Sequence, residues 1–268
     1  MAEPNDDVPR IPDYGSGVYR RRIHIERVEQ DGHGGVVVGE LEDDFHHFRT
    51  RVTHDGHKVT AIEGEGLRIP WTTCAGAGAP LEALCGAPLL PSAVDVARHT
   101  DVRLQCTHLY DAAVLAVATA ARGHAHRIYD ATIPDRNDGR ACVTLARDGT
   151  IVLAWHVNGM QITEPAPYAG QGMLAGFVRW CYATLDIEDA EAAQVLRRAV
   201  FIALGRQYDF DRIPRAGGFA GVAGRCHTFN EDRIEEATRV HGTVRYLRDV
   251  DPDTLAAARP SGDQGRVH

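Results

Sequence analysis

The feature that most constrains the fold of this chain is a series of segments in which apolar and polar residues alternate. Four such segments follow one another between residues 18 and 66, with Asp-Gly and Gly-Gly pairs at their boundaries. Alternation with a period of two is typical of strands that bury one face, and these dipeptides favour tight hairpin turns. The sequence therefore predicts an antiparallel sheet built from VYRRRIHIERV, GGVVVGELED, FHHFRTRVTHDG and HKVTAIEGEG.

Helical patterns follow these segments, and the order from strands to helices then repeats. Residues 78–86 and 91–100 predict short helices, and residues 106–122 predict a longer one that Gly123 ends. The helical period and charged end residues of the later segments predict three more helices. Strands are then predicted at residues 125–134, 139–149 and 150–159, and helices at residues 173–185, 186–210 and 230–242.

The predicted fold class is α+β, an antiparallel sheet with helices packed on one face, followed by a second α+β domain. A chain of 268 residues is long enough for two modest domains, each with its own core. We expect these domains at residues 18–122 and 123–250. Residues 1–17 and 251–268 are polar and without periodicity, and we expect them to be disordered tails.

The net charge limits the kinds of molecule that this chain can bind, and the distribution of cysteines indicates the state of its thiols. The net charge of −8 argues against binding to nucleic acid or to an anionic membrane, because both need a basic surface. No apolar run approaches the roughly 18 residues of a membrane span, and the first residues lack the pattern of a signal peptide. We therefore expect a cytoplasmic protein with a small-molecule substrate. The six scattered cysteines indicate reduced thiols or metal ligands.

Chemically active residue types gather at three places in the first half of the chain, one of which is Cys74 in the loop segment PWTTCAGAG before a short predicted helix. Cys106 and His108 lie at the start of the long predicted helix, and the segment EDDFHH brings carboxylates and imidazoles to the start of a predicted strand. If Thr107 is the N-cap, Cys106 lies beside the positive end of the helix dipole, which favours a thiolate. Strand alternation places Asp44 and His46 on one face.

The order of these elements resembles the IscU/NifU-like iron-sulfur scaffold fold over residues 18–122. In that family an aspartate at a strand start, a cysteine before a helix and a cysteine at the last helix hold the metal. The resemblance implies Asp44, Cys74 and Cys106 as metal ligands. Glu42 stands where the family has its first cysteine, and Gln105 where it has a histidine. With fewer thiolates, the set suits zinc or another divalent metal better than an iron-sulfur cluster.

Three functions follow from these residues as hypotheses. The first is a metal-dependent hydrolase or lyase with a pocket between the two domains, in which His46 or His108 transfers a proton or supplies the fourth ligand. The second is a sulfur acceptor or iron-sulfur scaffold that uses Cys106. The third is a binding module with a vestigial site.

The same residues also have plainly structural interpretations. Cys74 and Cys106 can be buried packing thiols, and Asp44 can be a turn residue. Cys226 and His227 either complete a site between the domains or cap and pack a helix. The whole chain also resembles a bacterial family of unknown function, whose RCHTF-like and LRRAVFIALGR-like segments follow the same front half; this implies that both halves work as one unit.

Overall fold

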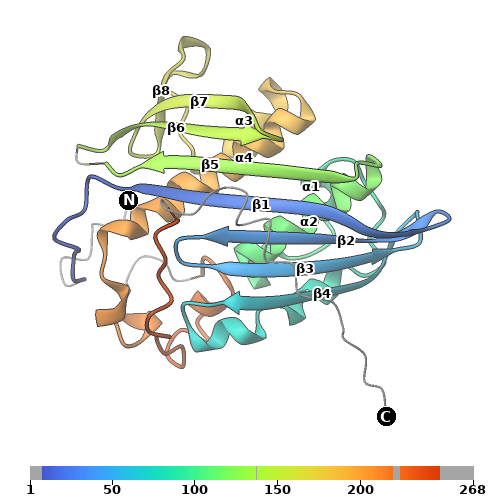
Figure 1. Ribbon diagram of the computed structural model, residues 1–268, viewed down its shortest axis with the longest axis horizontal. Coiled ribbons are helices and arrows are strands. Elements are labelled where there is room, and N and C mark those ends of the chain that lie inside the picture. Colours follow the sequence, from blue (N-terminus) through green and yellow to red (C-terminus); the bar gives the residue numbers. More distant parts are fainter. Residues whose placement is uncertain (1–7, 137, 220–223, 248–268) are drawn as a thin grey trace.

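A single antiparallel sheet of eight strands forms the frame of the protein in the computed structural model (Figure 1), which describes residues 8–136, 138–219 and 224–247. The strand order is β4-β3-β2-β1-β5-β6-β7-β8. The predicted antiparallel sheet and α+β class are therefore confirmed. The strands are β1 (Val18–Asp31), β2 (Gly34–Asp43), β3 (His47–His54), β4 (Val59–Arg68), β5 (His126–Pro134), β6 (Arg140–Arg147), β7 (Thr150–Asn158) and β8 (Gln161–Glu164).

Strand β1 joins the two segments that the sequence predicts as separate domains. It pairs with β2 on one side and with β5 on the other, so that Ile23 lies opposite both Leu41 and Tyr129. The strands of residues 18–122 and 123–250 are thus continuous in one sheet. The division of the chain into two domains stays a prediction.

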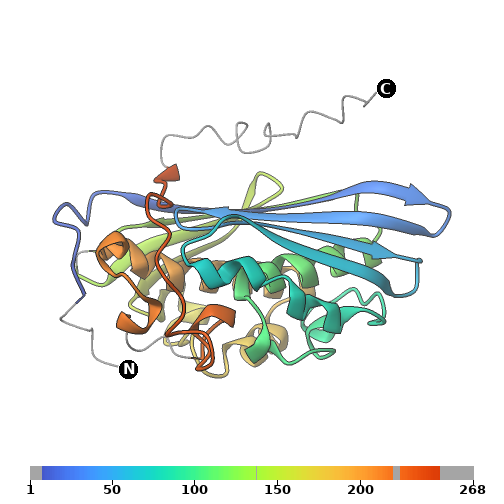
Figure 2. The same cartoon turned by 90° about the horizontal axis from the view of Figure 1, so that it is seen from below.

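The helices lie on one face of this sheet (Figure 2). The long helix α2 packs on β1 to β4, and α4 packs mainly on β5 to β7. Within the described residues, no helix is long and apolar enough to cross a membrane. The α-helices are α1 (Ala93–Ala97), α2 (Thr107–Ala121), α3 (Phe177–Thr184) and α4 (Ile187–Ala203); two 3-10 helices that matter below are η1 (Thr72–Gly76) and η8 (His227–Phe229).

Small residues allow α2 to approach the sheet closely. Ala112, Ala113 and Ala116 on α2 are fully buried. A Cβ atom on Gly39 of β2 would lie 2.9 Å from the carbonyl oxygen of Ala112, closer than real Cβ atoms come. Because packing at this distance leaves no room for a side chain, Gly39 and the alanines together determine how closely α2 lies over the sheet.

The predicted helix at residues 230–242 is wrong. This segment forms turns, and Thr238 and Arg239 make isolated antiparallel bridges to Arg215 and Trp71. The Trp71–Arg239 bridge gives these residues hydrogen-bond partners far away in the sequence, which compete with a continuous helix. Local capping signals could not reveal these partners. The short strand β8 was also missed.

The predicted tails lie largely outside the described residues, which leave out 1–7 and 248–268. Residues 8–17 of the predicted N-terminal tail are described, and they contact the rest of the protein. Val8 is buried, and Arg10 makes an antiparallel bridge to Tyr208. This part of the segment therefore belongs to the packed structure.

Candidate metal centre

The site is built on the turn that joins β2 to β3. Asp43 is the last residue of β2, and its Oδ1 atom accepts hydrogen bonds from the backbone N–H groups of Phe45 and His46, both at 2.9 Å. Such bonds from the backbone to an aspartate side chain are typical of tight turns. Residues 44–46 therefore form a turn, and the prediction that Asp44 and His46 share a strand face is wrong.

Arg68 fixes the backbone of this turn from the end of β4. Its buried guanidinium donates to the carbonyl oxygens of Asp43 at 2.6 Å, Asp44 at 3.1 Å and His46 at 3.1 Å. It also donates to the carbonyl oxygen of Thr243 at 2.8 Å. One side chain thus binds three carbonyl groups of the turn, and it ties the C-terminal part of the described chain to the turn.

The Asp43 carboxylate is completely buried, and β1 supplies its partners. Arg21 lies directly opposite Asp43 in the strand register, and its Nη2 and Nε atoms donate to Oδ2 at 2.6 and 3.1 Å. The Tyr19 hydroxyl donates to the same oxygen at 2.8 Å. Burial by itself raises the pKa of Asp43, but the charges of His46 and Arg21 outweigh it and hold that pKa well below its usual value.

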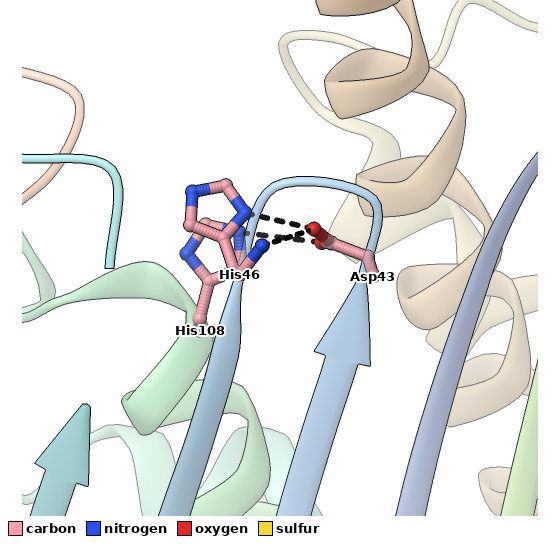
Figure 3. Close-up of side chains that lie close together, drawn as sticks. All are labelled: Asp43, His46 and His108. Carbon is pink, nitrogen blue, oxygen red and sulfur yellow. Dashed lines mark hydrogen bonds and ion pairs between the residues drawn. The ribbon is translucent and has the colours of Figure 1, made fainter. Parts of the chain in front are cut away.

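Two imidazole rings complete the group (Figure 3). The rings of His46 and His108 stack with centroids 3.9 Å apart. His46 Nδ1 lies 2.9 Å from Asp43 Oδ1, and His108 Nε2 lies 4.0 Å from Asp43 Oδ2. Ligand atoms of Asp43, His46 and His108 lie within 4.8 Å of one another, and this is the one such group of three in the described part of the chain.

His108 is the member of the group that most clearly lacks a partner. Burial, and then the charges of His46 and Arg21, lower the pKa of His108 well below its usual value, so its ring is neutral. Its Nε2 atom is buried and has no hydrogen-bond partner among the described residues. Imidazole and carboxylate ligands suit zinc and iron. The group fits a metal ion, because an ion would give this orphaned nitrogen a partner.

Asp44 is not part of this group. Its carboxylate forms a buried ion pair with Arg206, which also binds Asp135, and its Oδ1 accepts a bond of 3.4 Å from the backbone N–H of Leu247. Burial raises the pKa of Asp44 to about 6, although Arg206 acts in the opposite direction. The structure thus brings together two of the predicted residues, His46 and His108, with Asp43 in place of its neighbour.

Cys74 and Cys106 lie in a separate, thiol-rich region. Cys74 Sγ is 3.1 Å from the hydroxyl of Thr228, and the N–H of His227 donates to the carbonyl of Gln105 at 3.1 Å. These contacts bring η1, η8 and the start of α2 together. In the described residues, Asp44, Cys74 and Cys106 do not converge as a set of metal ligands.

The predicted thiolate at Cys106 is wrong. Cys106 is itself the N-cap of α2, and no side-chain bond caps the helix there. Burial raises the pKa of Cys106 far above its ordinary value, and the nearby thiols of Cys226 and Cys74 raise it further. Backbone hydrogen bonds from Leu109 and His108 act in the opposite direction and do not compensate. A helix N-terminus therefore does not activate a thiol that water cannot reach.

Two surface grooves lie away from the Asp43 group. One runs along α1 and α3 and is lined by residues such as Arg98, Arg179 and Tyr182. The other is lined by residues such as Arg122 and Glu188. Neither groove includes a residue of the Asp43 group, so the predicted pocket between two domains remains a hypothesis.

Sequence reasoning missed Asp43, Tyr19 and Arg21. A signal for Arg21 was present, because strand alternation places Tyr19 and Arg21 on the same face as the buried Ile23 and Ile25. An arginine at an apolar position of a strand indicates a buried partner of opposite charge. The register of β1 against β2 identifies that partner as Asp43.

Comparison of the chain with protein-family models and with curated proteins finds no match. What the group does is therefore inferred from its geometry and chemistry.

Proposed function

We propose that this protein is a metal-dependent enzyme that acts on a small molecule and holds a zinc or iron ion at Asp43, His46 and His108. The observation that carries the proposal is the buried Nε2 atom of a neutral His108, which has no hydrogen-bond partner in the described part of the chain and lies beside a charged carboxylate and a second imidazole. Neutral imidazole is the form that binds metals, and ligands on the β2–β3 turn and on the packed helix α2 form a preorganised site.

The chemistry proposed for this site is that of a hydrolase or lyase. A bound zinc or iron ion supplies a Lewis acid that polarises a carbonyl group or lowers the pKa of a water molecule. Asp43 provides the negative charge, and His46 and His108 provide imidazole nitrogen atoms. Three protein ligands leave a coordination position open for substrate, as in catalytic zinc sites.

The sulfur-acceptor function implied by the resemblance to IscU/NifU-like scaffolds is the alternative. It needs a reactive thiolate, and the raised pKa of Cys106 counts against it. A small-molecule partner and a cytoplasmic location remain part of the main proposal.

Zinc titration of the full chain by calorimetry tests the proposal. We expect about one zinc ion per chain in the wild type, no binding at this site in His108→Ala, and unchanged binding in Cys106→Ala. The two variants are matched, because both side chains are buried at the start of the same helix. Binding that survives His108→Ala and disappears in Cys106→Ala would overturn the proposal in favour of a thiol site.

The enzymatic part needs a separate measurement. We expect a screen of ester, amide and phosphate substrates to reveal an activity that the zinc-loaded wild type shows and that His108→Ala lacks. Tight zinc binding without any metal-dependent turnover across the screen would instead support a structural metal.

A further inference from the structure

The two oxygens of the Asp43 carboxylate have different surroundings. Oδ2 accepts three bonds from side chains, namely the Tyr19 hydroxyl and the Nε and Nη2 atoms of Arg21. Oδ1 accepts two backbone N–H groups from the turn and lies 2.9 Å from His46 Nδ1. Each oxygen thus has three polar contacts, but all three on Oδ2 come from Tyr19 and Arg21, whereas one of those on Oδ1 comes from the ring of His46, which is itself a proposed ligand.

We propose that Tyr19 and Arg21 are positioning residues of the metal site, which hold Oδ2 of Asp43 so that the carboxylate offers only Oδ1 to the ion. This inference rests on the proposed function. It assigns a role to two residues of β1 that do not themselves coordinate the metal.

The geometry favours Oδ1 as the coordinating oxygen. An ionised carboxylate only accepts hydrogen bonds, so His46 Nδ1 carries the proton in its contact with Oδ1. A metal ion held by Asp43 and His46 would replace that single proton, and the backbone N–H groups of Phe45 and His46 could keep their bonds to Oδ1. Coordination through Oδ2 would instead require the ion to displace Tyr19 and a fully buried guanidinium.

The strand register makes this arrangement rigid. Tyr19 and Arg21 point to the same buried face of β1, the Tyr19 hydroxyl accepts a bond of 3.0 Å from Arg21 Nε, and Arg21 lies opposite Asp43. Both side chains are essentially inaccessible to solvent. Carboxylate ligands that are held by such outer contacts are already oriented when the metal arrives.

The decisive variant is Tyr19→Phe, because it removes one neutral hydroxyl and leaves the charge of the site unchanged. If Tyr19 positions the carboxylate, losing a hydrogen bond weakens zinc binding about 2- to 10-fold. If instead Tyr19 competes with the metal for Asp43, its removal tightens binding. The measurement is the zinc dissociation constant, obtained by competition with a chelating dye. Unchanged or tighter binding would overturn the inference.

Tyr110→Phe is the matched control. The Tyr110 hydroxyl is also hydrogen-bonded and in a buried residue, but it donates to the carbonyl oxygen of Ala97 at 2.9 Å. We expect its loss to leave zinc affinity unchanged. Arg21→Lys keeps the positive charge but cannot reproduce the two guanidinium contacts, so it should weaken binding at least as much as Tyr19→Phe.

A spectroscopic readout separates positioning from a general loss of stability. Cobalt is bound in place of zinc, and the visible absorption spectrum is recorded at saturating metal. We expect a changed spectrum in Tyr19→Phe, because the carboxylate geometry changes, and an unchanged one in Tyr110→Phe. Wild-type binding that His108→Ala abolishes, together with an unaltered Tyr19→Phe spectrum, would contradict only this inference. Absence of binding in the wild type would contradict the proposed function itself.

Discussion

Two regions meet at the start of α2, and burial shifts the pKa values of their side chains in opposite directions. His108 faces Asp43 and His46 on the sheet, whereas Cys106 lies near Cys74 and Cys226. Burial disfavours charged forms, so it keeps His108 as neutral imidazole and keeps Cys106 as a protonated thiol. Metals bind neutral imidazole but need deprotonated sulfur. The same buried environment therefore holds His108 in its metal-binding form, whereas Cys106 would have to lose a proton on binding a metal.

The two regions also differ in how their polar groups are held. In the Asp43 group, paired strands place Arg21 and Asp43 opposite each other. Backbone N–H groups of the turn donate hydrogen bonds to the Asp43 carboxylate. In the thiol region, the contacts are made by loops and 3-10 turns, such as the hydrogen bond between the thiol of Cys74 and the hydroxyl of Thr228. A sheet ladder fixes side-chain positions more tightly than loops do. Variants that disturb one region should therefore have effects of different size from variants in the other.

The largest effect is expected from breaking the buried ion pair of the Asp43 group. Arg21→Met leaves the Asp43 charge buried without its cation, which should destabilise the fold by about 3 to 5 kcal/mol. Urea unfolding followed by circular dichroism measures this change. The control is Arg51→Met, whose partner Glu29 is exposed, and it should cost less than about 1 kcal/mol. Equal costs for the two variants would contradict the importance assigned to Arg21.

A smaller effect on the free energy of unfolding is expected from the titration of Asp44, the residue next to Asp43 in the sequence. Its pKa is raised from 3.8 to about 6, so between these values the folded state holds a proton that the unfolded state has lost. The contribution of Asp44 to stability is then present below about pH 4 and is lost as the pH rises through about 6, by about 1 to 3 kcal/mol.

Urea unfolding of the metal-free protein at several pH values tests this sign. We expect the stability of the wild type relative to Asp44→Asn to fall between pH 4 and pH 6. A difference that stays constant or rises over this interval would show that the ion pair with Arg206 outweighs burial.

The smallest effect is expected from the thiol region. Cys106→Ala removes one buried sulfur atom and should cost about 1 kcal/mol in stability. The exposed Cys85 provides the comparison, and Cys85→Ala should change the unfolding midpoint little. A loss of several kcal/mol in Cys106→Ala would mean that the thiols form a network as important as the Asp43 group.

Most of the sheet could be predicted from the sequence, because strand alternation is a local property. The predicted strand over residues 34–43 coincides with β2, and the predicted helix from Cys106 differs from α2 by one residue at each end. The predicted helix over residues 230–242 is wrong because the structure of this segment depends on distant residues rather than on local pattern. There the bridges to Trp71 and Arg215 depend on residues far away in the sequence.

The candidate site could be predicted only in part. His46 and His108 were singled out for their chemistry, and the structure brings them together. Asp44 was preferred over Asp43 through the family resemblance and by treating residues 44–46 as a strand. The turn reverses the chain at this point, so that Asp43 points inward to Arg21 while Asp44 pairs with Arg206.

The sequence by itself therefore determined the antiparallel strands, the long alanine-rich helix and the kinds of side chain available for chemistry, because these follow from local periodicity and composition. Only the tertiary structure decided which carboxylate joins the two histidines and which nitrogen is left without a partner. The physical reason is that strand register and the close packing of α2 on Gly39 set distances between residues more than 60 positions apart, such as Asp43 and His108.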